Sequence, residues 1–116
     1  MNLSTTYSFL PHHQLRAYGV AVELLQAVIA ARISDAKLRD EALRAAKGTC
    51  LNLAEGAGRV TRADKACAYV VARGEMVEAI AAVEIAAQCG QAKLEALPLV
   101  LELGNKLNAM MNKLIR

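Results

Sequence analysis

The sequence predicts an all-α protein, an antiparallel up-down-up-down four-helix bundle. Hydrophobic residues make up 55% of the 116 residues, and more than a third of them are alanine, the best helix former. Aromatic residues, which strands favour, make up only 3%. The length fits one domain, and four segments with helical periodicity follow one another with short turns. Four such helices pack most simply as an antiparallel bundle.

The first helix is predicted over residues 14–33. It follows an N-terminal tail over residues 1–13 and opens a bundle domain over residues 14–116. Apolar residues recur in it at spacings of three and four, as on one face of an amphipathic helix. The predicted core row is Leu15, Tyr18, Val22, Leu25, Ile29 and Ile33, and a second apolar row is Val20, Leu24, Ala27 and Ala31.

Capping residues mark the start of the second helix. Ser34 and Asp35 supply side chains that can accept hydrogen bonds from the first backbone N–H groups. Gly56 and Gly58 are expected to end this helix. Its predicted core row is Leu43, Ala46, Cys50, Leu53 and Ala57.

The third helix is the longest of the four. Thr61 and Asp64 resemble a capping box, so the helix is expected to start near Arg62 and to run to Cys89, with Gly90 as its stop. Its predicted core row is Ala66, Tyr69, Arg73, Met76, Ile80, Val83 and Ala87.

The fourth helix is predicted from an apolar row close to the C-terminus. That row is Leu97, Val100, Leu103, Leu107, Met110 and Leu114. Pro98 fits the helix only in its first turn, where a backbone N–H has no intrahelical partner.

Three of the helices have more apolar surface than one core row requires. Beside the second row of the first helix, the extra residues are Ala68, Ala72, Ala79, Ala82 and Ala86 on the third, and Leu101, Met111 and Ile115 on the fourth. A single bundle would expose part of this surface, which soluble monomers rarely do, so an oligomer is expected. The alternative is that the alanines occur there only because alanine favours a helix, and that they lie on a solvated face.

Several classes of function and site have no support in the sequence. The three cysteines match neither a zinc site nor a disulfide framework and are expected to be small buried residues. No phosphate-binding loop or catalytic set is visible, so we expect no enzyme, no cofactor and no metal. No apolar stretch is long enough to span a bilayer and no secretory signal is visible, which predicts a cytoplasmic protein without membrane contact.

A structural polar cluster is predicted between the second and third helices. Asn52 and Glu55 stand near the end of the second helix, where a carboxylate meets the negative end of the helix dipole and needs a cation. Arg73, a cation in an otherwise apolar row, is one candidate partner for Glu55. Arg59, four residues further on, is the other, and would form a solvated surface pair.

The excess of positive charge lies on the second helix and the turn after it. Residues 37–65 hold seven basic and four acidic residues, whereas the rest of the chain is balanced. Such a patch is expected of a protein that binds nucleic-acid phosphates, although a solvated helix face explains it as well. The candidate nucleic-acid-binding residues are Arg44, Lys47, Arg59, Arg62 and Lys65.

The region from Leu43 to Arg59 resembles the signature of the 23S rRNA-intervening-sequence protein family, the bacterial four helix bundle proteins. The specific element is N-x-A-E-G-x-G-R, matched by Asn52, Ala54, Glu55, Gly56, Gly58 and Arg59. The chain departs from the family's pattern at Gly48, Cys50 and Glu75, where serine, proline and serine are usual.

The resemblance implies a four-helix bundle that assembles as a ring-shaped homo-oligomer, typically a pentamer. A related branch, the accessory variability determinant of diversity-generating retroelements, is associated with nucleic acid. The sequence thus leaves two functions open. One is an oligomer that binds RNA or DNA through a basic face, and the other is an oligomeric scaffold for a protein partner.

Overall fold

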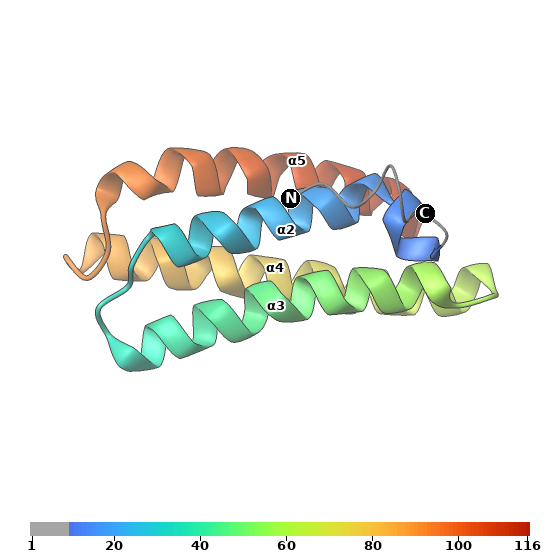
Figure 1. Ribbon diagram of the computed structural model, residues 1–116, viewed down its shortest axis with the longest axis horizontal. Coiled ribbons are helices and arrows are strands. Elements are labelled where there is room, and N and C mark those ends of the chain that lie inside the picture. The colour runs from blue at the N-terminus through green and yellow to red at the C-terminus, as the bar shows by residue number, and fades with distance from the viewer. Residues whose placement is uncertain (1–9) are drawn as a thin grey trace.

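The computed structural model describes residues 10–116 and contains four long helices that pack in an antiparallel bundle (Figure 1). These are α2 (Arg16–Ala30), α3 (Ala36–Gly58), α4 (Arg62–Gln88) and α5 (Leu97–Ile115), with short 3-10 helices η1 (Pro11–Gln14) and η2 (Leu94–Ala96). Within this described part there is no strand. The predicted all-α bundle is confirmed, whereas residues 1–9 of the predicted tail lie outside the described residues.

The local capping predictions are confirmed. The Asp35 side chain accepts from the N–H of Leu38 at 3.0 Å, and the Thr61 hydroxyl accepts from the N–H of Asp64 at 3.1 Å. Pro98 lies in the first turn of α5. Gly90 has a φ of +72° just after α4, a conformation that costs glycine little.

The predicted core row of the first helix was wrong. The buried residues of α2 include Val20, Leu24, Ala27 and Ala31, the row that was expected to be spare. Of the predicted core row, Ile33 is buried in the loop after α2, but Ile29 is 55% exposed and the others are half-buried. The reason is geometric, because small side chains such as Ala27 and Ala31 let neighbouring helices approach closely, while most of the larger side chains of the other row pack half-buried at the edge of the core.

The alanine row of α4 is also buried within one subunit. All five of its members have at most 5% exposure, and Met111 of α5 is fully buried. The expectation that these residues form spare surface is therefore corrected. Of the predicted spare residues of the fourth helix, Leu101 does remain exposed, and further apolar surface lies on Ile29, Val70, Val77 and Ile85.

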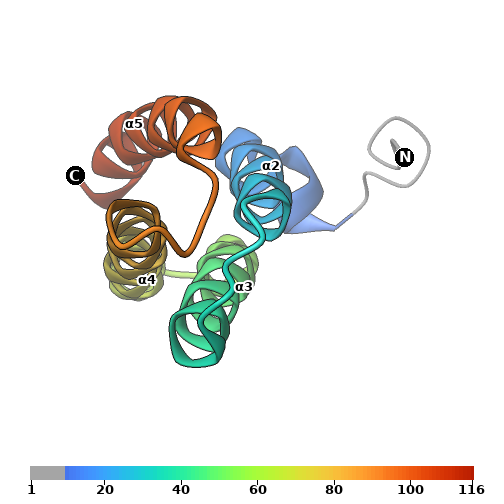
Figure 2. The same ribbon diagram turned by 90° about the vertical axis from the view of Figure 1, so that its left-hand side faces the viewer.

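Figure 2 shows the bundle from the end where two loops meet, with α2 and α3 on one side and α4 and α5 on the other. The N–H of Ser34, between α2 and α3, donates to the carbonyl of Gln91, between α4 and α5, at 2.8 Å. The N–H of Lys93 donates to the carbonyl of Ala31 at 3.5 Å. These bonds fix the two loops side by side.

Among residues 10–116, no helix combines the length and the apolar character that crossing a membrane requires.

Candidate nucleic-acid interface

Arg44 is exposed on the surface of α3, but its side chain pairs with carboxylates. Its guanidinium forms ion pairs with Glu41 at 3.1 Å, with Glu75 at 3.4 Å and with Glu78. The hydrogen bond from Arg44 holds the pKa of the Glu41 carboxyl below its usual value. Because three carboxylates surround one cation, the local charge is negative, which disfavours a phosphate here.

Lys47 is exposed in the middle of α3. It lies roughly 18 Å along the helix from Arg59, at about 1.5 Å per residue. The five candidate residues therefore do not form one continuous patch, and Lys47 stands apart from the three that follow α3.

Arg59, Arg62 and Lys65 lie together at the end of the bundle where α3 turns into α4. Lys65 Nζ donates to the carbonyl of Ala57 at 2.8 Å and to that of Gly56 at 3.4 Å, which caps the C-terminus of α3. Carbonyl oxygens carry no formal charge, so Lys65 keeps its own. Arg62 donates through Nε to the backbone oxygen of Arg116 at 3.1 Å, which ties the start of α4 to the end of α5.

Three further cations reach the same end from α2 and α5. Arg16 and Lys113 line one shallow groove where α2 begins and α5 ends, and Arg116 follows α5 directly. We call this set the basic end; its six cations are Arg16, Arg59, Arg62, Lys65, Lys113 and Arg116. Only two carboxylates, Glu55 and Asp64, belong to the same turn region. The sequence did not reveal this set because its members are far apart along the chain.

The predicted polar cluster is corrected by the structure. Glu55 pairs with Arg59 at 2.9 Å, with side chains 56% and 37% exposed, so the second of its two candidate partners is the one observed. Arg73 instead donates to Asn112 of α5 at 2.8 Å, because its position on α4 faces α5 rather than α3. Asn52 donates to the carbonyl of Gly48 within its own helix at 2.8 Å.

A model of the 23S rRNA-intervening sequence protein family matches residues 13–113. The chain belongs to this family. No curated protein matches it.

In this member of the 23S rRNA-intervening sequence protein family, signature residue Gly56 has a packing role. The residue is buried inside α3 and does not end it, contrary to prediction, since the helix continues to Gly58. A side-chain carbon at Gly56 would lie 2.6 Å from the Tyr69 ring of α4. Burial raises the pKa of the Tyr69 hydroxyl. The signature glycine therefore lets α3 and α4 approach over an aromatic ring.

Two departures from the family's pattern face each other between α3 and α4. A side-chain carbon at Gly48 would lie 3.0 Å from a carboxylate oxygen of Glu75. The family usually has serine at both positions. The larger residue at Glu75 is thus matched by the missing side chain at Gly48, and it also supplies one of the carboxylates around Arg44.

The three cysteines differ in their burial. Cys50 is buried, and burial raises the pKa of its thiol to about 11. Cys67 and Cys89 are exposed, so the prediction that all three are buried was wrong for these two. Among residues 10–116, no group of three or more His, Cys, Asp or Glu side chains is arranged to hold a metal ion.

Proposed function

We propose that this family member is a non-enzymatic, cytoplasmic homo-oligomer that binds nucleic acid, RNA in the first place, through the basic end of each subunit. The observation that carries the proposal is the convergence of six cations from four helices on that end. Lys65 bonds only to backbone carbonyls and so keeps its charge for phosphates. Arg44, one of the original candidates, is left out because carboxylates surround it.

Assembly strengthens this proposal. One subunit offers few phosphate contacts, and such binding is weak and sensitive to salt. Several basic ends presented together, as in a ring, would act at a high effective concentration on one RNA chain. Because neither Tyr18 nor Tyr69 is exposed, the part of the chain from residue 10 onward places no exposed aromatic ring among the six cations, and we expect binding that depends little on base sequence.

The test measures the affinity for a fluorescent RNA oligonucleotide over a series of salt concentrations. Arg16→Gln with Lys113→Gln removes two cations, neither of which caps a helix. For single strands, we expect the slope of log affinity against log salt to fall by about 0.7 for each phosphate that is no longer neutralised. Arg44→Gln is the matched control and should leave the slope unchanged. Absence of binding at low salt, or equal slopes in all variants, would contradict the proposal.

A scaffold that binds a protein partner is the second candidate. The observation that favours it is the exposure of large apolar side chains, among them Leu51 at 69% and Val71 at 51%. Contiguous apolar surface marks interaction sites on soluble proteins. An intact oligomer that binds no RNA or DNA at low salt would favour this function over the first.

A further inference from the structure

Two grooves lie on opposite sides of the bundle. The first, of about 500 Å³, lies between α2 and α3 and is lined by Ile29, Ile33, Leu43 and Arg39 among others. The second, of about 240 Å³, lies between α4 and α5 and is lined by Val77, Ala81, Leu101 and Glu84 among others. Figure 2 shows the helix pair of the first groove opposite the helix pair of the second. We call them the α2–α3 groove and the α4–α5 groove.

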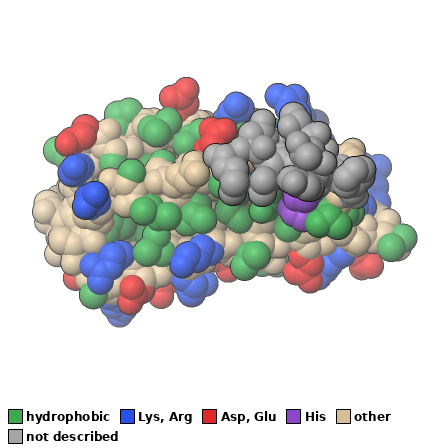
Figure 3. Space-filling model, in the orientation of Figure 1, with side chains coloured by type: hydrophobic (Ala, Val, Ile, Leu, Met, Phe, Trp, Pro, Cys, Tyr) green, Lys and Arg blue, Asp and Glu red, His purple; other side chains and the backbone are tan. Residues whose placement is uncertain are grey.

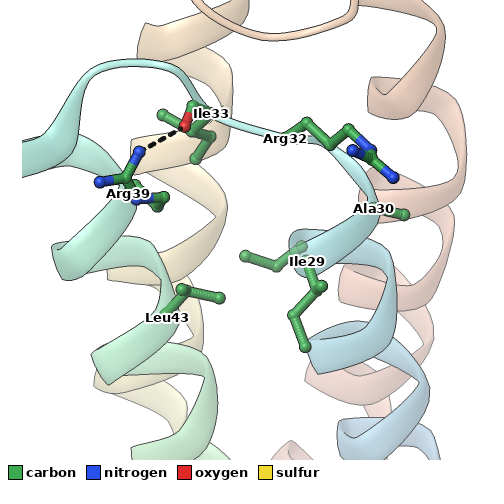
Figure 4. Close-up of a pocket in the computed structure, with 7 residues that line it drawn as sticks. Ile29, Ala30, Arg32, Ile33, Arg39 and Leu43 are labelled. Carbon is green, nitrogen blue, oxygen red and sulfur yellow. Dashed lines mark hydrogen bonds between the residues drawn. The ribbon is translucent and has the colours of Figure 1, made fainter.

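The α2–α3 groove combines an apolar floor with two cations, Arg32 and Arg39. Figure 4 shows Ile29 of α2 and Leu43 of α3 pointing toward one another, with Arg39 beside them. Arg39 donates through Nη1 to the carbonyl of Ile33 at 3.4 Å, and within the described chain it has no carboxylate partner. Figure 3 shows that hydrophobic side chains continue along this face and that basic side chains, with some acidic ones among them, border it.

The α4–α5 groove has the opposite charge. Val77 is 56% exposed and Leu101 is 39% exposed, and Glu84 lines the same groove. In residues 10–116 the carboxylate of Glu84 forms no ion pair. An apolar surface with an unpaired anion on one side of the molecule thus complements an apolar surface with an unpaired cation on the other.

The two charged residues also lie at the same height along the bundle. Arg39 is about one turn after the start of α3, and Glu84 is about one turn before the end of α4. Both helix ends are at the end of the bundle where the Ser34–Gln91 bond joins the loops. A contact between surfaces at equal heights adds no rise along the helices, so it is compatible with copies related by rotation about an axis parallel to the helices, as in a ring.

From this match we infer that the α4–α5 groove of one copy docks on the α2–α3 groove of the next, with Glu84 of one copy paired to Arg39 of the other. The inference rests on the oligomer in the proposed function and names the surfaces that form it. Ile29 and Leu43 then pack against Val77 and Leu101, whose removal from water drives association. The basic ends of all copies point the same way.

The first test is light scattering coupled to gel filtration. We expect Val77→Glu to reduce the wild-type assembly to the 12.4 kDa subunit. Val60→Glu, at a site 91% exposed in the turn at the other end of the bundle, is the matched control and should keep the assembly. Arg39→Glu and Glu84→Arg should each weaken it, and the two together should restore it. Thermal melts identify variants that fail to fold.

Disulfide cross-linking gives a second measurement that does not depend on losing the assembly. Arg39→Cys with Glu84→Cys, in a chain with Cys67 and Cys89 replaced by serine, should form linked chains on oxidation. Position 39 lines the α2–α3 groove and position 84 lines the α4–α5 groove, and these helix pairs lie on opposite sides of the bundle, so a bond between the two positions must join two copies.

Each result bears on one of the two proposals. An assembly that survives Val77→Glu and gives no 39–84 link overturns the docking surfaces while leaving an oligomeric RNA-binding protein. A wild-type monomer overturns the docking surfaces and the oligomer together. Assembly without RNA binding overturns only the nucleic-acid function.

Discussion

Helices α3 and α4 meet at two glycines, and the two regions differ in what the glycine faces. Gly48, in the middle of α3, faces the flexible carboxylate of half-buried Glu75, whereas Gly56, near its end, faces the buried ring of Tyr69. The cations beside the two glycines also differ in their partners. Arg44 beside Gly48 contacts carboxylates, and Lys65 beside Gly56 contacts carbonyls. The comparison teaches that the partners of a cation, more than its exposure, decide whether it can bind a phosphate.

The largest effect is expected at Gly56. Gly56→Ala places a carbon 2.6 Å from the buried Tyr69 ring, and overpacking of this kind costs about 1–3 kcal/mol. Chemical denaturation of the variant measures the loss of unfolding free energy. Gly58→Ala is the matched control, since nothing lies within 4 Å of that position. Equal stability of both variants would show that the close approach to Tyr69 is unimportant.

The cap formed by Lys65 is expected to have a moderate effect. Lys65→Met keeps the chain length but removes the hydrogen bonds to the carbonyls of Gly56 and Ala57. A net loss of about 1 kcal/mol in unfolding free energy is expected for such bonds. Lys47→Met, on the exposed surface of α3, should change stability by less than about 0.5 kcal/mol. A cap without structural value would give the two variants the same melting curve.

Gly48 should respond in the opposite direction to Gly56. Gly48→Ala gains up to about 1 kcal/mol of helix propensity. The new carbon meets only the end of the Glu75 side chain, which can move toward solvent and give up an exposed ion pair worth about 0–1 kcal/mol. We expect a net stabilisation of roughly 0.5 kcal/mol, measured by the same denaturation. A destabilised Gly48→Ala would mean that Glu75 is held rigidly.

The smallest effect concerns pH and the carboxylates around Arg44. The Glu41 pKa is lowered in the folded protein by its hydrogen bond to Arg44. The unfolded chain therefore binds protons first, and the stabilisation is present above the ordinary value of 4.5 and is lost as pH falls through the folded pKa. Thermal melts of wild type and Arg44→Gln should differ at pH 7 and converge in acid. Curves that stay parallel at every pH would contradict this linkage.

Local signals in the sequence were sufficient for the helices. Asp35, Thr61 and Pro98 act through backbone groups within a few residues, so their roles follow from spacing alone. The family signature indicated the bundle in the same way, because its residues lie within a short stretch of the chain, at the end of α3 and directly after it. Family membership and the all-helical fold were therefore predictable.

The sequence could not decide between two rows of equal spacing or between two possible partners of one side chain. Two rows of α2 have the same spacing, and larger side chains favoured the row of Leu25 although the row of Leu24 is buried. The sequence offered two partners for Glu55, Arg59 and Arg73. Only the structure shows that Arg73 faces Asn112 instead, which leaves Arg59 as the partner. The basic end could not be predicted either, because Arg16, Lys113 and Arg62 meet only when the chain folds.

The contact between Gly48 and Glu75 also constrains the order in which this pair could have changed during evolution. From a family pattern with serine at both positions, glutamate at position 75 would meet the side chain at position 48 first. Glycine at position 48 opens the space beforehand at the cost of some helix propensity. The route through glycine first is the less obstructed one. Homologues with glutamate at position 75 are therefore expected to pair it with the arginine at position 44 where position 48 is glycine, and to turn it toward solvent where position 48 carries a side chain.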